Sequence, residues 1–333
     1  MAQMVRKAVG LISGGLDSTV ATQLMRDQGI EIQGLYFSMP WGCCDKEEAF
    51  RAARHFDIPL MVIKLNEDYL ENVVKDPKYG YGTAMNPCVD CRIYMFRIAK
   101  QYMEQIGASF IYTGEVLGQR PMSQVRSKLE IIAEDSGLTG QLLRPLSAKL
   151  LEPTAPEREG VVDRERLLDL CGRSRQAQIE LAERYGIVNY PQPAGGCLLT
   201  NDEFAKRVQD LLDHKEHPTL TDMELLRIGR QFRLSDRTKL IVGRNEQEND
   251  LLAGYAGRAG VLCRPMGFLG PSALVSGEVT EDVRRQAAEV ILSYTKPERR
   301  DSHRIECVGD GDAIIVQAAR VPTLDELQLL RIG

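Results

Sequence analysis

The sequence Val9-Gly10-Leu11-Ile12 is followed at once by Ser13-Gly14-Gly15-Leu16-Asp17-Ser18 and then by Thr19-Val20-Ala21-Thr22. A short apolar run, a glycine-rich turn and a further apolar segment predict a buried strand, a tight loop and a helix. The glycines let the backbone approach an anion closely, and the N–H groups at a helix start carry partial positive charge. The stretch therefore predicts a phosphate-binding loop.

The side chains of this loop add to that prediction. Ser13 and Ser18 supply hydroxyl donors for a phosphate. Asp17 cannot favour a bare phosphate, and is better explained as a ligand of the Mg²⁺ that accompanies a nucleotide. An ordinary strand-to-helix turn with an aspartate cap is the alternative.

The loop has neither the Gly-Lys-Ser/Thr of the Walker loop nor the Gly-x-Gly-x-x-Gly dinucleotide fingerprint. It resembles the PP-loop of ATP pyrophosphatases. That resemblance implies an enzyme that cleaves ATP between its α and β phosphates and adenylates a carbonyl oxygen. The expected nucleotide-binding residues of the loop are Ser13, Gly14, Gly15, Asp17 and Ser18.

Strands and helices alternate through the first half of the chain. Strands are expected at 32–37, 60–63 and 110–114, and helices at 46–56 and 91–106. This alternation predicts an α/β fold with a doubly wound parallel sheet, whose ligands lie beyond the carboxyl ends of the strands. A charged helical pair is expected over 164–185.

A proline- and glycine-rich connector at 190–196 predicts a domain boundary. The expected domains are a PP-loop domain at 1–190 and a smaller α+β module at 191–333, for which RNA binding is one candidate function. Within the module, helices are expected at 202–212 and 221–228. Strands are expected around 239–243, 261–264 and 313–318.

The composition is that of a soluble protein, with 333 residues, 43% hydrophobic and 27% charged, and a net charge of −5. The charge argues against a protein that coats nucleic acid through bulk electrostatics, but it allows a local basic groove. No signal peptide or membrane span is expected, which favours a cytoplasmic location. Eight cysteines in such a chain are unlike a disulfide framework, so some are expected to do chemistry.

One cysteine group stands out. Cys88 and Cys91 form a C-x-x-C motif at an expected helix start, where the dipole and Arg92 would favour thiolate, and Cys197 follows two glycines. Structural zinc normally takes four ligands, whereas three thiolates on a 4Fe-4S cluster leave one iron open to hold a sulfide. Persulfide or disulfide chemistry, a zinc site completed by a histidine, and buried structural thiols are the alternatives.

The other cysteines are expected to have structural roles. The pair Cys43-Cys44 is either loop packing or chemistry, because adjacent cysteines rarely ligate one metal. Cys171, Cys263 and Cys307 stand alone on apolar elements and are expected to be buried small hydrophobes.

A more specific resemblance rests on several segments together. Residues 34–41, 56–60 and 86–92, with the loop, resemble the PP-loop tRNA thiouridylases, above all the 2-thiouridine synthases and the related 4-thiouridine synthases. The resemblance covers about the first 120 residues and resumes at Cys197. It implies that Cys88 and Cys197 are catalytic together with Asp17, and that Cys88, Cys91 and Cys197 ligate an oxygen-sensitive 4Fe-4S cluster.

The resemblance also implies where the rest of ATP lies. Gly114 falls where the family's strand end closes over the nucleotide, and the adenine would rest near Phe37 and Ser38. Glu115 departs from the histidine that often follows this glycine in 2-thiouridine synthases, which leaves the target base open between 2-thio and 4-thio products.

The expected function is therefore an ATP-dependent tRNA sulfurtransferase with Mg²⁺ as cofactor. Sulfide or an external carrier would donate the sulfur, since no rhodanese-like domain follows. The sequence leaves monomer and homodimer both open. Two rivals remain: a PP-loop enzyme that sulfurates or amidates a small molecule, and a nucleotide- and redox-sensing binding protein. Candidate tRNA phosphate contacts are Arg92, Arg120, Arg126, Lys128 and Arg144, although a solvated surface charge is the favoured interpretation of each residue taken alone.

Overall fold

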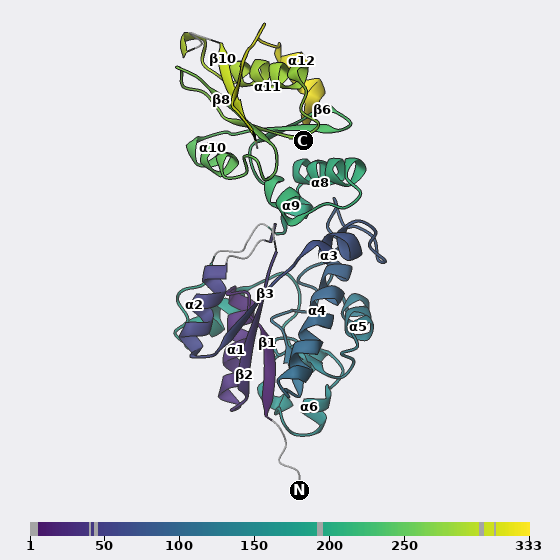
Figure 1. Cartoon of the computed structure of the whole chain (residues 1–333). Helices are drawn as coiled ribbons and strands as arrows, with labels where there is room; N and C mark the ends of the chain where they lie inside the picture. The colour runs from purple at the N-terminus through teal and green to yellow at the C-terminus, as the bar shows by residue number, and fades with distance from the viewer. Residues whose placement is uncertain (1–5, 40, 43–45, 192–195, 300–302, 310) are drawn as a thin grey trace. The chain divides into compact units, whose positions relative to one another are not determined.

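The chain folds into two compact units, at Met1–Thr200 and Asn201–Gly333. The computed structural model describes residues 6–39, 41–42, 46–191, 196–299, 303–309 and 311–333 (Figure 1). The Cys43-Cys44 pair and most of the expected connector at 190–196 lie outside the described residues. We describe each unit separately.

The N-terminal unit is an alternating α/β structure. Its elements in chain order are β1 (Lys7–Leu11), α1 (Leu16–Asp27), β2 (Glu31–Ser38), α2 (Lys46–Phe56), β3 (Leu60–Lys64), α3 (Glu67–Tyr69), the π-helical turn η1 (Leu70–Val74), α4 (Cys88–Gln105), β4 (Phe110–Tyr112), α5 (Arg126–Asp135), β5 (Leu142–Leu143), α6 (Ala155–Arg158) and α7 (Gln176–Arg184), with 3-10 turns at Ala148–Leu150, Arg164–Arg166 and Leu198–Thr200.

The five strands of this unit form a parallel sheet in the order β3-β2-β1-β4-β5. Chain order runs outward from β1 to β3 and then returns to the other side of β1 at β4. The strand order thus reverses between β1 and β4, and in open α/β sheets the carboxyl ends at such a reversal form the ligand crevice. The predicted doubly wound fold is confirmed, and the Ser13–Ser18 loop lies at this point.

Helices cover both faces of the sheet. In Figure 1, α1 and α2 lie on one side of the strands, and α4 and α5 lie on the other. The core between α1 and the sheet includes Val20, Phe110 and Tyr112, all at most 1% exposed. The Tyr112 hydroxyl donates to the Thr22 hydroxyl at 3.0 Å, which satisfies two polar groups that would otherwise be buried without partners.

The C-terminal unit is α+β, as predicted. Its seven-stranded sheet has the order β11-β10-β8-β9-β7-β6-β12. Each pair of neighbouring strands is antiparallel. The elements in chain order are α8 (Asp202–His214), α9 (Leu220–Leu225), β6 (Arg230–Ser235), β7 (Thr238–Val242), α10 (Glu246–Ala253), β8 (Val261–Pro265), β9 (Ala273–Gly277), α11 (Glu281–Ser293), a 3-10 turn at Pro297–Arg299, β10 (Arg304–Val308), β11 (Ile314–Gln317), α12 (Leu324–Leu330) and β12 (Arg331–Ile332).

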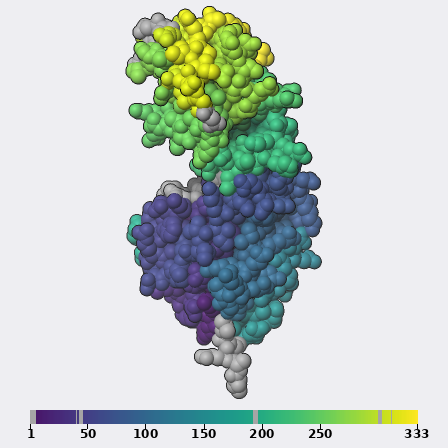
Figure 2. Space-filling model, viewed as in Figure 1, coloured from purple at the N-terminus to yellow at the C-terminus, as the bar shows by residue number. Residues whose placement is uncertain are grey.

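Helix α11 supplies the main packing against this sheet. Its buried face carries Ala287, Ala288 and Ile291, which join strand residues such as Phe232 and Val275 in one core. The small alanines allow the helix to approach the strands closely. The last elements of the chain, yellow in Figure 2, lie at the surface of this unit.

Three local expectations were wrong. The segment 164–185 is helical only as a 3-10 turn at Arg164–Arg166 and as α7, because the intervening residues form turns and an isolated bridge between Leu117 and Cys171. Cys171 is exposed rather than buried. Cys263 and Cys307 are buried as expected, but they contact each other instead of standing alone.

Among the residues that the structure describes, no helix combines the length and apolar character needed to cross a lipid bilayer.

The contact between Gly114 and α1 generates a stability prediction. A Cβ at Gly114 would lie 2.5 Å from the backbone nitrogen of Ser18, so Gly114→Ala should lower the free energy of unfolding of the N-terminal unit by about 1–3 kcal/mol. Trp41 is the only tryptophan of the chain and is fully buried in this unit, so urea unfolding followed by tryptophan fluorescence reads the effect directly.

Gly42→Ala is the matched control, because its Cβ would meet no atom nearer than 3.5 Å. We expect it to stay within about 0.5 kcal/mol of wild type. Equal unfolding curves for Gly114→Ala and wild type would contradict the close approach.

Candidate functional site

The Ser13–Ser18 loop is held in shape by its own hydrogen bonds. The Gly15 N–H donates to the Ser13 hydroxyl at 3.3 Å, the Ser18 hydroxyl donates to the Gly15 carbonyl at 2.9 Å, and the two hydroxyl oxygens lie 3.1 Å apart. Among the described residues, no side chain caps the start of α1. The first N–H groups of the helix therefore remain available to an anion.

Two glycines make this loop possible. Gly14 has a φ of +77°, and a Cβ there would lie 2.3 Å from the carbonyl carbon of Glu48 in α2. Gly114 follows β4 and packs against the backbone of Asp17 and Ser18. Glycine is thus required both for the conformation of the loop and for the closeness of its neighbours.

Asp17 lies in the crevice with one oxygen in use and one unused. Its Oδ2 accepts from Gln119 Nε2 at 3.1 Å and lies 3.7 Å from an Arg175 nitrogen. Its Oδ1 is buried and has no hydrogen-bond partner among the described residues. A buried carboxylate oxygen without a partner is costly, and a bound cation would satisfy it. This donor atom fits the Mg²⁺ expected from the sequence.

Sequence reasoning did not find Gln119 or Arg175. Gln119 lies in a turn after β4, and Arg175 precedes α7, more than 150 residues from the loop. The Arg175 Nε is also buried without a hydrogen-bond partner among the described residues. No local motif surrounds either residue, so only the fold could identify them.

Phe37 and Ser38 lie at the carboxyl end of β2, next to β1 in the sheet. The Ser38 carbonyl accepts from the Leu65 N–H at 3.0 Å, which ties this strand end to the segment after β3. Both side chains are partly exposed. They share the sheet edge with the Ser13–Ser18 loop, where a base attached to a bound triphosphate could rest.

The three cysteines singled out by the sequence all lie near one buried tyrosine. The Tyr69 hydroxyl donates to Cys91 Sγ at 3.2 Å. Burial first, then the neighbouring thiols of Cys91, Cys197 and Cys88, raise the pKa of Tyr69 well above its usual value. Cys197 is more than 100 residues from the C-x-x-C motif, yet its sulfur is close enough to act on the same hydroxyl.

Each thiol of this group has polar contacts. Asn86 Nδ2 donates to Cys88 Sγ at 3.2 Å, and Cys197 Sγ lies 3.8 Å from the Trp41 carbonyl oxygen. Asn86 is 3% exposed, and its Oδ1 accepts from the Ala84 N–H. Donors aimed at cysteine sulfurs are typical of iron–sulfur sites, where they tune the cluster.

The expectation of an easily ionised Cys91 was wrong. Burial raises the pKa of the Cys91 thiol, while the Tyr69 hydrogen bond and the charge of Arg92 lower it by less. The charges of Cys88 and Asp90, on the same first turns of α4, raise the pKa of Cys91 further.

Within the described ranges, no group of three or more histidine, cysteine, aspartate or glutamate side chains is arranged to hold a metal ion. The donor set of Cys88, Cys91 and Cys197 nevertheless fits a cluster, whose cysteine ligands bind different irons. Cysteine thiolates are the usual ligands of iron–sulfur clusters, and two of these three sulfurs accept a hydrogen bond from a neighbouring side chain.

Glu115 is a buried anchor beside Gly114. It is 3% exposed, its Oε2 accepts from Arg144 Nε at 3.0 Å, and its Oε1 lies 3.6 Å from Arg92 Nε. Arg144 is itself 6% exposed and also donates to the Leu129 carbonyl. The expected contact between Arg144 and tRNA phosphate was wrong, because this guanidinium is buried and occupied within the unit.

The other basic residues named as candidate phosphate contacts differ in their exposure and in the contacts they already make. Arg126 is exposed but donates to the Leu150 carbonyl at 2.7 Å, and the Lys128 ammonium lies 5.5 Å from the centre of the Tyr79 ring. Arg120 is exposed, and Arg92 is half-buried beside Glu115.

Two family models match the chain. Residues 4–149 match the model described as thiamine biosynthesis protein (ThiI), and residues 229–327 match the model described as NFACT protein RNA binding domain. The resemblance of the first half to the PP-loop tRNA thiouridylases is confirmed. The second match falls within the C-terminal unit.

Curated relatives agree with this assignment. The tRNA-specific 2-thiouridylase MnmA of Clostridium kluyveri is 34% identical over 128 residues, covering 33% of this chain and 36% of the relative. MnmA of Xanthobacter autotrophicus is 27% identical over 230 residues, covering 64% of this chain and 56% of the relative. The chain thus spans between about a third and about half of the length of these relatives.

Two solved structures show weaker likeness. One is a 4-thiouridine synthetase–RNA complex with bound ATP, which is 21% identical with a TM-score of 0.37, covering 66% of this chain and 52% of that chain. The other is a predicted subunit of tRNA methyltransferase from Methanocaldococcus jannaschii, which is 16% identical with a TM-score of 0.30, covering 42% of this chain and 68% of that chain.

The unused oxygen of Asp17 generates a binding prediction. Asp17→Asn removes the charge but keeps the shape, so it should weaken binding of Mg-ATP by about 10-fold or more while leaving metal-free ATP unweakened. Isothermal titration calorimetry without and with excess EDTA measures the affinities for Mg-ATP and for metal-free ATP separately. Asp27→Asn, at the other end of α1, is the matched control. If Asp17→Asn weakened ATP binding equally with and without Mg²⁺, Asp17 would not be a metal ligand.

The Tyr69 hydrogen bond generates a prediction about pH. The hydroxyl lowers the pKa of Cys91, so Tyr69→Phe should raise that pKa further, and alkylation of Cys91 in the metal-free protein should begin at higher pH than in wild type. Mass spectrometry of the peptide that contains Cys91 across a pH series measures the shift. Tyr94→Phe, whose ring packs on Tyr69, controls for lost packing. An unshifted profile for Tyr69→Phe would contradict the assigned donor.

Proposed function

We propose that this chain is an ATP-dependent tRNA sulfurtransferase, which adenylates a uridine carbonyl and replaces its oxygen with sulfur. The observation that carries the proposal is the combination, within one unit, of a glycine-rich loop at the start of α1 with three cysteine thiols that lie near one buried tyrosine. Neither part alone would distinguish sulfur transfer from other ATP-dependent chemistry.

The loop supports the first step. The N–H groups at the start of α1 and the Ser13 and Ser18 hydroxyls would bind the phosphates, and Asp17 Oδ1 would hold Mg²⁺. Mg²⁺ supplies charge neutralisation to the triphosphate when it is bound. Arg175 has an unused donor next to Asp17 and would stabilise the departing pyrophosphate.

The chemistry of the substrate explains why ATP is needed. A carbonyl oxygen of uridine is a poor leaving group. Attack of that oxygen on the α phosphate forms an oxygen–phosphorus bond and releases pyrophosphate, after which a sulfur nucleophile at the ring carbon can displace AMP. The step needs positioning and charge stabilisation rather than a strongly perturbed protein base.

The cysteines support the second step. Cys88, Cys91 and Cys197 would hold a 4Fe-4S cluster, which supplies an open iron able to bind sulfide. Asn86 and Tyr69 would orient and tune two of the three sulfurs through their hydrogen bonds. The buried ring of Tyr69, packed against Tyr94, would exclude water around the thiols. Sulfide or an external carrier would supply the sulfur.

The substrate assignment rests on the similarities of the chain. The C-terminal unit matches an RNA binding domain, and the curated relatives of the first half are named as tRNA-specific enzymes. The target uridine must leave its stack to reach a buried crevice, which suits recognition at a loop of the tRNA. Glu115, held by Arg144 and Arg92, would fix the wall of this crevice.

The test is an anaerobic turnover assay with unmodified tRNA, Mg-ATP and sulfide. We expect AMP and pyrophosphate release that requires tRNA, and thiouridine detected by mass spectrometry of the digested tRNA. Cys88→Ala and Cys197→Ala should keep the pyrophosphate release and lose the thiouridine. Cys171→Ala is the matched control, because Cys171 is an exposed thiol of the same unit.

Metal analysis of the same preparations tests the cluster. Wild type should carry about four irons per chain with a broad absorption near ~400 nm, and both active-site variants should lose them. Thiouridine formation by an iron-free protein would overturn the cluster but keep the sulfurtransferase. Pyrophosphate release without tRNA would favour a small-molecule substrate, and no release under any condition would favour a nucleotide sensor.

A further inference from the structure

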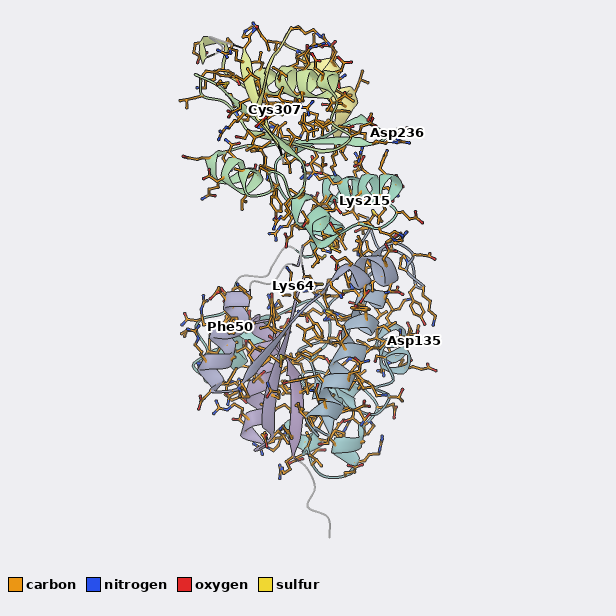
Figure 3. All side chains as sticks on the ribbon, in the orientation of Figure 1. Phe50, Lys64, Asp135, Lys215, Asp236 and Cys307 are labelled. Atoms are coloured by element: carbon orange, nitrogen blue, oxygen red, sulfur yellow. The ribbon has the colours of Figure 1, made fainter. Side chains whose placement is uncertain are left out.

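Two cysteines of the C-terminal unit lie opposite each other on adjacent strands. Cys263 on β8 and Cys307 on β10 are direct partners in the antiparallel register, and their sulfur atoms are 2.8 Å apart. Their exposed fractions are 0% and 2%. Figure 3 labels Cys307 within the sheet of this unit.

The register places this pair at a site where a disulfide can form. The Met266 N–H donates to the Arg304 carbonyl at 2.9 Å, so positions 266 and 304 are a hydrogen-bonded pair. Opposed pairs alternate along an antiparallel ladder, which makes the third pair along, Cys263 and Cys307, non-hydrogen-bonded. Side chains of such pairs lie closest, with Cα atoms about 4.5 Å apart, within the range that a disulfide spans.

The pair differs from ordinary core packing because one thiol borders a cavity. A cavity of about 300 Å³ is lined by Cys307, Arg284 and Val261, together with Gly309, Gly311, Asp312 and Ile314. Ile314 is 45% exposed, so the cavity reaches the surface beside β11. Arg284, on α11, has a buried Nε with no hydrogen-bond partner in the described part of the chain.

The two thiols are not equivalent. The hydrogen bond from Cys263 lowers the pKa of Cys307, and the charge of Arg284 lowers it further, against the opposing effect of burial. The same pairing raises the pKa of Cys263. Cys307 is therefore the thiol that borders the cavity and whose pKa its neighbours lower.

We propose that Cys263 and Cys307 form a redox-active dithiol site that is oxidised to an intramolecular disulfide by low-molecular-weight disulfides entering the cavity. The Cys307 thiolate attacks one sulfur of the small disulfide, forming a mixed disulfide and releasing one small thiolate. That thiolate takes the proton of Cys263. The Cys263 thiolate then attacks the Cys307 sulfur and breaks the mixed disulfide, and the second small thiolate leaves and takes up from water the proton that Cys307 lost when it ionised. Two protein thiols are oxidised and one small disulfide is reduced to two thiols.

Arg284 has a defined part in this reaction. Its guanidinium faces the cavity beside Cys307 and would stabilise the attacking thiolate. This site is separate from Cys88, Cys91 and Cys197, which belong to the N-terminal unit. The inference therefore does not depend on the proposed sulfurtransferase activity.

The test uses the full chain, fully reduced and then freed of reductant without oxygen. After incubation with 2-hydroxyethyl disulfide, the protein is denatured in excess iodoacetamide, digested without reductant and examined by mass spectrometry. We expect a Cys263–Cys307 cross-linked peptide and the loss of both alkylated forms. Subsequent dithiothreitol should restore both. If both thiols remain alkylated while the exposed Cys171 forms mixed disulfide, the proposal is overturned.

Variants test the order of attack. Cys263→Ser should stop the reaction at a stable mixed disulfide on Cys307, whereas Cys307→Ser should leave Cys263 unmodified over the same time. Arg284→Met should slow the formation of the adduct on Cys307 by about 10-fold, whereas Arg285→Met, on the exposed side of α11, should not. A mixed disulfide on Cys263 in place of Cys307 would overturn the assigned roles. The wild-type experiment decides the proposal even if a variant fails to fold.

Discussion

The N-terminal unit depends on the close approach of the end of β4 to the first turn of α1. Gly114 has no side chain, so the strand end lies directly against the backbone of Asp17 and Ser18. The sheet order reverses at this point, which leaves a crevice with uncapped helix N–H groups and a partly unsatisfied carboxylate. A side chain at this glycine would push the strand end away from the helix and distort the loop.

Burial has a strong effect on two ionisable groups of the N-terminal unit, Glu115 and Cys91. Glu115 is a buried anion, and its two arginine neighbours compensate the cost of removing it from water. Cys91 has a raised pKa because desolvation exceeds the help from Tyr69 and Arg92. A buried thiol with a raised pKa, such as Cys91, favours the protonated form until something stronger than a hydrogen bond, such as a metal, stabilises the thiolate.

The sequence predicted those features that are encoded locally. The helix expected at 46–56 matches α2 residue for residue, and the strand and helix around Ser13–Ser18 follow from a glycine turn between apolar runs. Features that depend on contacts between residues far apart in the sequence were not predicted. Arg175 reaches Asp17 from a segment without a motif, and a burial pattern cannot show that Cys263 faces Cys307, because strand register is set by the whole sheet.

The distribution of the site along the chain also fixes the order in which it can be assembled during synthesis. All five strands of the parallel sheet are complete by Leu143, whereas Arg175 and Cys197 follow it. In a ribosome-bound chain all five strands are therefore synthesised before Cys197, which lies close to the end of this unit at Thr200. Domains generally fold as units, so the unit can complete its fold only after Cys197 has been made. Cys88 and Cys91 therefore have no third thiol to join until synthesis of the unit is nearly complete.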